Sequence, residues 1–120
     1  VDQYYAAADV FVFSSTTETQ GLVVMEAMTY GLPAVAVRGG GASAAIEDGL
    51  NGYIVDSQPQ SMAERVLQIF ANESEFARLS DGAKTTSMDY TISAMADRVL
   101  DVYQSALGQA DPTQAEIHVR

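Results

Sequence analysis

The order of apolar and polar segments predicts alternating strands and helices over the first half of the chain. Short apolar runs at 10–13, 34–37 and 53–55 are rich in β-branched and aromatic residues, which is typical of buried parallel strands. Helical segments are expected between them, at 21–30 and 42–47, with glycine near their ends. Strand and helix alternating at this spacing predict right-handed crossovers and a parallel sheet with helices on both faces.

The amino-terminal residues extend this pattern. The run 10–13 is apolar at every position, so we expect a central strand rather than an edge strand. Residues 1–8 are expected to form the last turns of a helix, with Tyr4, Tyr5 and Ala8 spaced to face a core.

From Ser57 onward the pattern predicts helices only. One helix starts at 59–61, a weaker second one continues to Gly82 or a little beyond, and a third starts after an N-cap at Thr91 and ends at 107–108. Their apolar stripes are Met62, Val66, Ile69 and Phe70; Phe76, Leu79 and Ala83; and Ile92, Met95, Val99, Val102 and Tyr103. We therefore predict a partial Rossmann-like three-layer α/β/α domain over 1–108, with a short parallel sheet, a helical C-terminal part and a frayed polar tail at 109–120.

Composition and charge exclude several classes of protein. The 120 residues are 48% hydrophobic and 18% charged, as in an ordinary soluble globular domain. The net charge of −10 argues against nucleic-acid partners and against docking of this segment alone on an anionic membrane. There is no cysteine, and no apolar run approaches the roughly 18 residues of a transmembrane helix. The chain starts in mid-pattern without Met, so we expect a fragment.

Candidate chemistry is expected where the strands end. Parallel sheets bind ligands beyond the carboxyl ends of their strands, and Ser14–Gly21, Arg38–Gly41 and Asp56 with its neighbours should reach that edge. A helix that starts at Gly21 presents free backbone N–H groups, which suit a phosphate. Residues 14–33 contain no basic side chain, so an anion there would depend on the amides and the helix dipole.

Two glutamates with seven residues between them bracket this turn. Glu26 lies in the apolar helical run 22–28, which we expect to be covered on nearly all sides, and a buried carboxylate there needs partners such as sugar hydroxyls. The alternative is that Glu26 faces solvent on one exposed edge of the helix. Glu18 precedes the helix, where it can serve as an ordinary capping group. From the residues alone, both alternatives stay open.

Two further features carry weaker signals. The glycines at 39–41 form a loop that glycine alone could bend so tightly, and turn chemistry by itself can explain them. The single histidine, His118, lies in the tail, so no Ser-His-Asp set and no metal cluster can be assembled, and we expect no role in chemistry for it.

Taken together, these residues resemble the nucleotide-sugar-binding half of the retaining family-4 glycosyltransferases of GT-B fold. The resemblance covers about residues 4 to 107. The paired-glutamate motif, followed by Gly-Leu-Pro, is far more specific than a lone glycine loop. The segments that carry the resemblance are Ala8–Ser15, Glu18–Met28, Gly31–Val35 and Arg38–Val55.

The resemblance implies a role for each motif residue. Glu18 is expected to contact the hydroxyls of the transferred sugar and to stabilise positive charge at its anomeric carbon, which makes it the candidate catalytic residue. Glu26 is expected to hold the nucleotide ribose, and the amides of Gly21 and Leu22 to contact the donor's phosphates and sugar. Gln20, the remaining candidate substrate-binding residue, departs from the phenylalanine common in the family and resembles members that glycosylate lipids.

The resemblance also implies a whole-protein activity. The parent would transfer a hexose from a UDP- or GDP-sugar to a lipid or saccharide acceptor with retention, without a cofactor or an essential metal. Its acceptor-binding domain and the Arg and Lys that grip the diphosphate would precede Val1, so the fragment alone should be inactive. A cytoplasmic parent is implied, which can lie peripherally at the inner membrane face. The alternatives are a GT-B-like sugar-nucleotide epimerase and a non-catalytic nucleotide-binding or interaction module.

Overall fold

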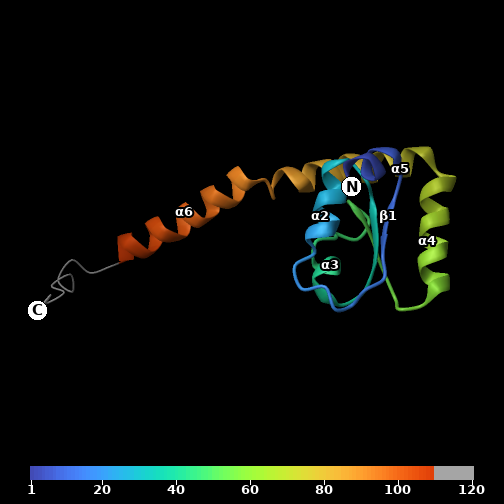
Figure 1. Cartoon of the computed structure of the whole chain (residues 1–120), viewed down its shortest axis with the longest axis horizontal. Coiled ribbons are helices and arrows are strands. Elements are labelled where there is room, and N and C mark those ends of the chain that lie inside the picture. The colour runs from blue at the N-terminus through green and yellow to red at the C-terminus, as the bar shows by residue number, and fades with distance from the viewer. Residues whose placement is uncertain (110–120) are drawn as a thin grey trace, which may run out of the picture. The chain divides into compact units, whose positions relative to one another are not determined.

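A short parallel sheet forms the centre of the first part of the molecule (Figure 1). The computed structural model describes residues 1–109. The strands are β1 (Phe11–Phe13), β2 (Ala34–Val37) and β3 (Gly52–Val55), in the order β1-β2-β3. All three predicted strands are confirmed to within one residue, and both pairings are parallel, as the alternating pattern required.

Strand β2 lies between the other two, and all four of its residues are buried. Its Ala36 lies opposite Phe13 of β1 and Ile54 of β3. Because successive side chains point to opposite faces, its alanines join one core and its valines, Val35 and Val37, join the other. A strand apolar on both faces therefore has a core on each side.

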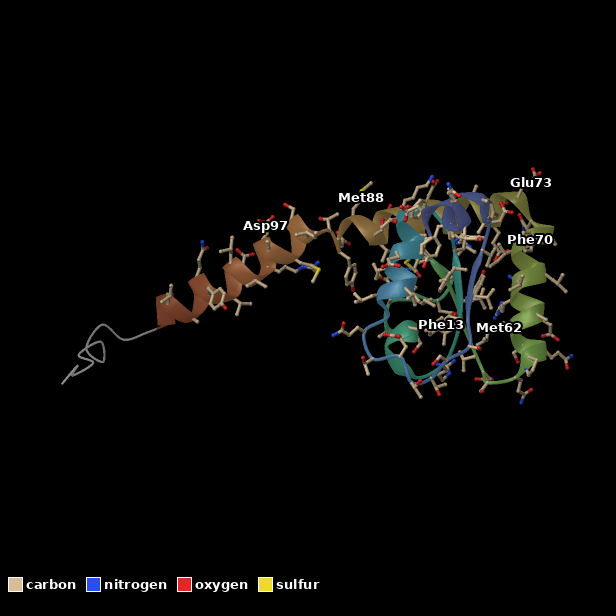
Figure 2. All side chains as sticks on the ribbon, in the orientation of Figure 1. Phe13, Met62, Phe70, Glu73, Met88 and Asp97 are labelled. Carbon is tan, nitrogen blue, oxygen red and sulfur yellow. The ribbon has the colours of Figure 1, made fainter. Side chains whose placement is uncertain are left out.

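Helices cover both faces of the sheet. On one face lie α2 (Leu22–Thr29) and α3 (Gly40–Ala44), and on the other lies α4 (Pro59–Ala71). Phe13 packs into the core beneath α2, whereas Met62 of α4 packs into the core on the opposite face (Figure 2). The predicted three-layer arrangement is confirmed. Each fully buried aliphatic side chain stabilises it by about 1.5–3 kcal/mol.

Helix α5 (Glu73–Met88) contributes to both cores, through Leu79 on the α4 side and Ala83 on the α2 side. The sequence placed its end near Gly82, but the helix continues to Met88. The reason is packing, since a Cβ on Gly82 would lie 2.0 Å from the carbonyl oxygen of Leu50. This glycine allows the helix to approach the turn before β3, rather than ending it.

Two expectations for the amino-terminal residues are wrong for the described chain. Helix α1 (Asp2–Ala7) exists, but Tyr4 and Ala8 are exposed and only Tyr5 is half-buried. Strand β1 lies at an edge of the sheet, and its Val12 is 45% exposed. No described strand pairs with the outer side of β1, which leaves Val12 open to solvent. Of the three residues predicted to face a core, Tyr5 packs against the rings of Phe11 and Tyr30.

A second compact unit begins at Tyr90 and contains α6 (Ile92–Gln109). The predicted N-cap is confirmed, because the Ala94 N–H donates to Thr91 Oγ1 at 3.2 Å. The helix passes through its predicted end at 107–108. Across residues 1–109, no helix is both long and apolar enough to span a bilayer. The predicted tail from residue 110 on, including His118, lies outside the described residues.

Candidate functional site

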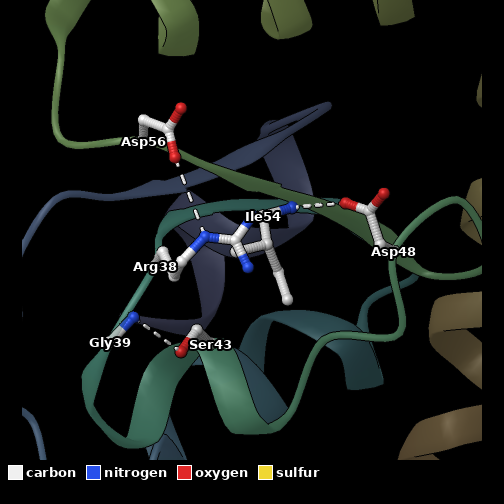
Figure 3. Close-up of polar contacts among 6 residues, drawn as sticks. All are labelled: Arg38, Gly39, Ser43, Asp48, Ile54 and Asp56. Carbon is white, nitrogen blue, oxygen red and sulfur yellow. Dashed lines mark hydrogen bonds and ion pairs between the residues drawn. The ribbon is translucent and has the colours of Figure 1, made fainter.

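The three segments predicted to meet beyond the carboxyl ends of the strands do meet there. The Gly41 N–H donates to the Glu18 carbonyl, which joins the loop after β1 to the loop after β2. Arg38, at the end of β2, forms an ion pair with Asp56, at the end of β3, with an Nε to Oδ1 distance of 3.7 Å (Figure 3). Both partners of this pair are largely exposed, so it contributes little to stability.

Glycine allows the first two loops to touch backbone to backbone. A Cβ on Gly40 would lie 2.7 Å from the carbonyl oxygen of Thr16, and one on Gly41 would lie 2.3 Å from the carbonyl carbon of Thr19. From the other side, a Cβ on Gly21 would lie 2.5 Å from the carbonyl oxygen of Gly41. Turn chemistry alone therefore does not account for Gly40 and Gly41, because the loop before α2 leaves no room for side chains there. The space around a Cβ on Gly39 is open, and its φ of 102° is what favours glycine at that position.

Ser43 fixes the shape of this glycine loop from within α3. Its Oγ accepts a hydrogen bond from the Gly39 N–H at 3.2 Å (Figure 3). It also donates one to the Gly40 carbonyl at 3.0 Å. Ser43 was not among the candidate residues predicted from the sequence. The available signal was a serine four residues after a glycine in a tight loop, the kind of local side-chain to backbone bond that serine favours.

Glu18 is half-buried in the loop between β1 and α2. Its Oε1 accepts a hydrogen bond from the Gln20 N–H at 3.2 Å, and the Gln20 side chain is exposed. In the same loop the hydroxyls of Ser15 and Thr17 lie 3.1 Å apart. An ionised carboxylate has about four acceptor positions, so this local bond leaves most of its capacity for a ligand's hydroxyl groups.

Helix α2 begins with Gly21 in the left-handed conformation, at φ 64°, as its N-cap, and no side chain caps it. The Val24 and Met25 N–H groups donate to the Gly21 carbonyl at 3.0 and 3.2 Å. Earlier N–H groups, those of Leu22 and Val23, have no acceptor within a helix. The start of α2 therefore offers two amides and the positive end of the helix dipole to an anion.

Glu26 lies on the exposed side of α2, together with Leu22 and Thr29. The expectation that this helix is covered nearly all round is therefore wrong for the described chain, where its opposite face alone enters the core. The Tyr5 hydroxyl donates to Glu26 Oε2 at 3.4 Å, and its ring stacks on Tyr30 with centroids 5.5 Å apart. Partial burial and, next, the Glu26 carboxylate raise the pKa of Tyr5 above its ordinary value.

A buried polar side chain stabilises the far end of the glycine segment. Asn51 is fully buried, accepts from the Glu47 N–H at 2.9 Å, and donates to the Ala45 carbonyl and to Thr86 Oγ1 of α5. These bonds end α3 at Ala44, earlier than the predicted end at Glu47. The bond of Asn51 to Thr86, 35 residues away, has no local signal in the sequence.

Two cavities open near this edge of the sheet. One, of about 250 Å³, is mostly apolar and is lined by Ser14, Val37, Ser57, Gln58, Pro59 and Met62. A larger one, of about 420 Å³, follows the outer side of β3, and its lining includes Arg38, Asp48 and Arg65. Asp48 accepts a hydrogen bond from the Ile54 N–H at 2.8 Å, which satisfies a backbone group on the open edge of β3 (Figure 3). Neither cavity is lined by Glu18 or Glu26.

Comparison with known proteins gives the family. The family described as "Glycosyl transferases group 1" matches residues 1–86. Among curated proteins, the D-inositol 3-phosphate glycosyltransferase of Corynebacterium urealyticum is 33% identical over 115 residues, which cover 95% of this chain and 27% of the relative. The protein of the same name from Streptosporangium roseum is 38% identical over 106 residues, covering 87% and 24%. The chain thus spans about a quarter of the length of these relatives.

Solved structures agree with the fold. Anabaena HepE in complex with UDP and glucose superposes with a TM-score of 0.75 at 26% identity, over 86% of this chain and 29% of that chain. The sucrose-phosphate synthase of Thermosynechococcus elongatus gives a TM-score of 0.75 at 27% identity, over 89% and 27%. The fold predicted from the sequence, a Rossmann-like part of a GT-B glycosyltransferase, is confirmed.

Proposed function

Because the chain belongs to the group 1 glycosyl transferases, we propose that its parent protein transfers a hexose from a UDP- or GDP-sugar to a lipid or saccharide acceptor. The transfer retains the anomeric configuration, as in the retaining family-4 enzymes that the motifs resemble. This chain supplies the sugar- and ribose-reading side of the donor site. The acceptor site and the cations that neutralise the diphosphate belong to the rest of the parent.

The position of Glu18 beside the start of α2 is the observation that carries this proposal. The Glu18 loop and Gly21 are in contact with the same glycine loop, so a carboxylate and an anion-binding helix start lie close together. A sugar diphosphate carries hydroxyl groups next to a charged phosphate. The hydroxyl groups suit the carboxylate, and the phosphate suits the helix start. The supporting neighbours include HepE structures in complex with UDP-glucose and with UDP.

In the proposed reaction, the bond between the anomeric carbon and the diphosphate oxygen breaks while the acceptor oxygen attacks from the same face. The leaving phosphate takes the acceptor's proton. Glu18 orients the sugar through its hydroxyls and stabilises the positive charge that develops at the anomeric carbon. The amides of Gly21 and Leu22, at the start of α2, contact the phosphates and the sugar, so they favour the departure of the charged diphosphate.

Glu26 is proposed to hold the ribose. Its carboxylate lies on the exposed side of α2 and has a single described partner, the Tyr5 hydroxyl, at a long 3.4 Å. A carboxylate can accept from two neighbouring hydroxyls at once, which is the pattern that a ribose offers. Gln20, exposed next to Glu18, is proposed to contact the same donor.

The test is sugar transfer by the full-length parent with Glu18→Ala and Glu18→Gln. With UDP-glucose and GDP-glucose as donors, both variants should lose on the order of 100-fold in kcat, because an interaction with developing charge is removed. Glu64→Ala, on α4, is the control and should keep full activity. Transfer by Glu18→Ala within a few-fold of the parent would show that Glu18 does not have the proposed role.

The same assay separates the alternatives. Product analysis without acceptor identifies an epimerase, which would convert the donor into a second sugar nucleotide. A non-catalytic module would bind the donor without consuming it. The acceptor panel should include a lipid, a saccharide and D-inositol 3-phosphate. The last of these is chosen because the curated relatives are named D-inositol 3-phosphate glycosyltransferase.

A further inference from the structure

We propose that Ser43 is a positioning residue for Glu18, acting through the glycine loop at 39–41. This inference rests on the proposed function, because it assumes that Glu18 reads the transferred sugar. Ser43 itself is one turn into α3 and makes its contacts with backbone atoms alone in the described structure. Its effect on the donor would be indirect.

Ser43 makes two hydrogen bonds to the backbone of the glycine loop. Its hydroxyl bridges the Gly39 N–H and the Gly40 carbonyl, at 3.2 and 3.0 Å, so both sides of the bend are fixed by one side chain. Gly39 and Gly40 have φ values of 102° and 76°. Glycine is the residue with the most conformational freedom, so a loop of three glycines has little preference of its own for this shape. The two Ser43 hydrogen bonds favour this one shape of the loop.

The glycine loop contacts the loop that carries Glu18. Gly41 donates its N–H to the Glu18 carbonyl, and a Cβ on Gly40 would lie 3.0 Å from that same oxygen. The carbonyl of Thr16 lies at 2.7 Å from the same Cβ position. Since the two backbones are in direct contact, a change in the path of residues 39–41 displaces the segment that carries Glu18.

The Ser43 bonds should affect the sugar part of the donor more than the nucleotide part. The Glu18 side chain has one described bond, to the Gln20 N–H in its own loop, so its place depends on that loop's backbone. Helix α2, in contrast, is fixed by buried Val24, Met25 and Met28. Loss of the Ser43 bonds should therefore weaken recognition of the sugar more than recognition of the nucleotide.

The test compares UDP-glucose with UDP on the full-length parent by calorimetry. Ser43→Ala should weaken UDP-glucose binding about fivefold or more, the equivalent of about one hydrogen bond, while UDP binding changes less than twofold. Ser43→Thr, which keeps the hydroxyl, should restore most of the loss. The matched control is Ser87→Ala, which removes a hydroxyl that likewise donates to the carbonyl three residues earlier, but in α5.

A double-mutant cycle with Glu18→Ala distinguishes positioning from a general structural role. If Ser43 acts through Glu18, adding Ser43→Ala to Glu18→Ala causes no further loss of UDP-glucose affinity. Equal losses for UDP and UDP-glucose, or additive losses in the cycle, would overturn the inference, as would no effect of Ser43→Ala. If Glu18→Ala itself leaves binding and transfer unchanged, the proposed function fails first, and this inference with it.

Discussion

The buried side chain of Asn51 connects the end of α3, which follows the glycine loop, to α5. It is fully buried and makes three hydrogen bonds, two to the backbone around the end of α3 and one to Thr86 of α5. Buried polar groups stabilise a structure when each has a partner, and they are costly when a partner is removed. Among residues 1–108, whose side chains the structure describes, no buried side-chain nitrogen or oxygen lacks a partner.

We predict that Asn51→Ala destabilises the fold by about 3 kcal/mol, because it removes the acceptor of the Glu47 N–H and the donor to the Ala45 carbonyl and to Thr86 Oγ1. The Thr86 hydroxyl keeps its own hydrogen bond to the Gly82 carbonyl. Urea unfolding of the 120-residue chain measures this, with the exposed Gln60→Ala as the control. A loss below about 0.5 kcal/mol, the range of ordinary surface substitutions, would contradict the assignment.

At the scale of the elements, the glycines inside the long helices α5 and α6 have opposite surroundings. Gly82 of α5 lies against the turn before β3, where a Cβ would clash with the Leu50 carbonyl at 2.0 Å. Gly108 of α6 has open space around its Cβ position. Helix propensity favours alanine over glycine at both positions by up to about 1 kcal/mol, so packing alone decides the difference.

The prediction is a pair of substitutions with opposite signs. Gly82→Ala should destabilise the chain by 2 kcal/mol or more, on the order of other overpacking changes, because α5 must move away from the turn. Gly108→Ala should leave stability unchanged or raise it by up to about 1 kcal/mol. Thermal unfolding followed by circular dichroism compares the two. A Gly82→Ala chain as stable as the parent would mean that α5 does not pack as described.

The elements also show what the sequence could predict. Strands β2 and β3 and helix α2 follow from apolar runs bounded by glycine and proline, because local patterning and burial agree there. The end of α5 could not be predicted, since Gly82 is explained by a contact with Leu50, 32 residues away. The exposure of Val12 was likewise unpredictable, because it depends on what pairs with the outer side of β1.

The sequence supplies the candidate site residues, whose roles stay predictions, and it says less about the contacts that support them. The pairing of Glu18 and Glu26 around Gly21 was recognisable from the motif, and the convergence of three segments followed from parallel-strand geometry. Ser43 was missed although its spacing from Gly39 offered a local signal. Asn51 was missed because its bond to Thr86 joins residues 35 positions apart. Glu26 lies on the exposed side of α2, which is the alternative that the residues alone had left open beside burial in the helix.

For the whole molecule, charge and length agree with the proposal that the donor site is shared between this chain and the rest of the parent. The net charge is −10, and residues 14–33 contain no basic side chain, so the start of α2 would face a diphosphate with amides alone. The chain spans about a quarter of its curated relatives. In our account, the rest of the parent supplies the cations, and this chain supplies the carboxylates that read the sugar and the ribose.

The most direct test of this account is the structure of the full-length parent with an intact UDP-sugar bound. The account predicts that the Glu18 carboxylate lies about 2.5–3.2 Å from hydroxyls of the sugar, that Glu26 accepts hydrogen bonds from the ribose, and that a phosphate oxygen contacts the start of α2. A donor bound elsewhere, or one whose sugar lies beyond hydrogen-bond distance of Glu18, would contradict it.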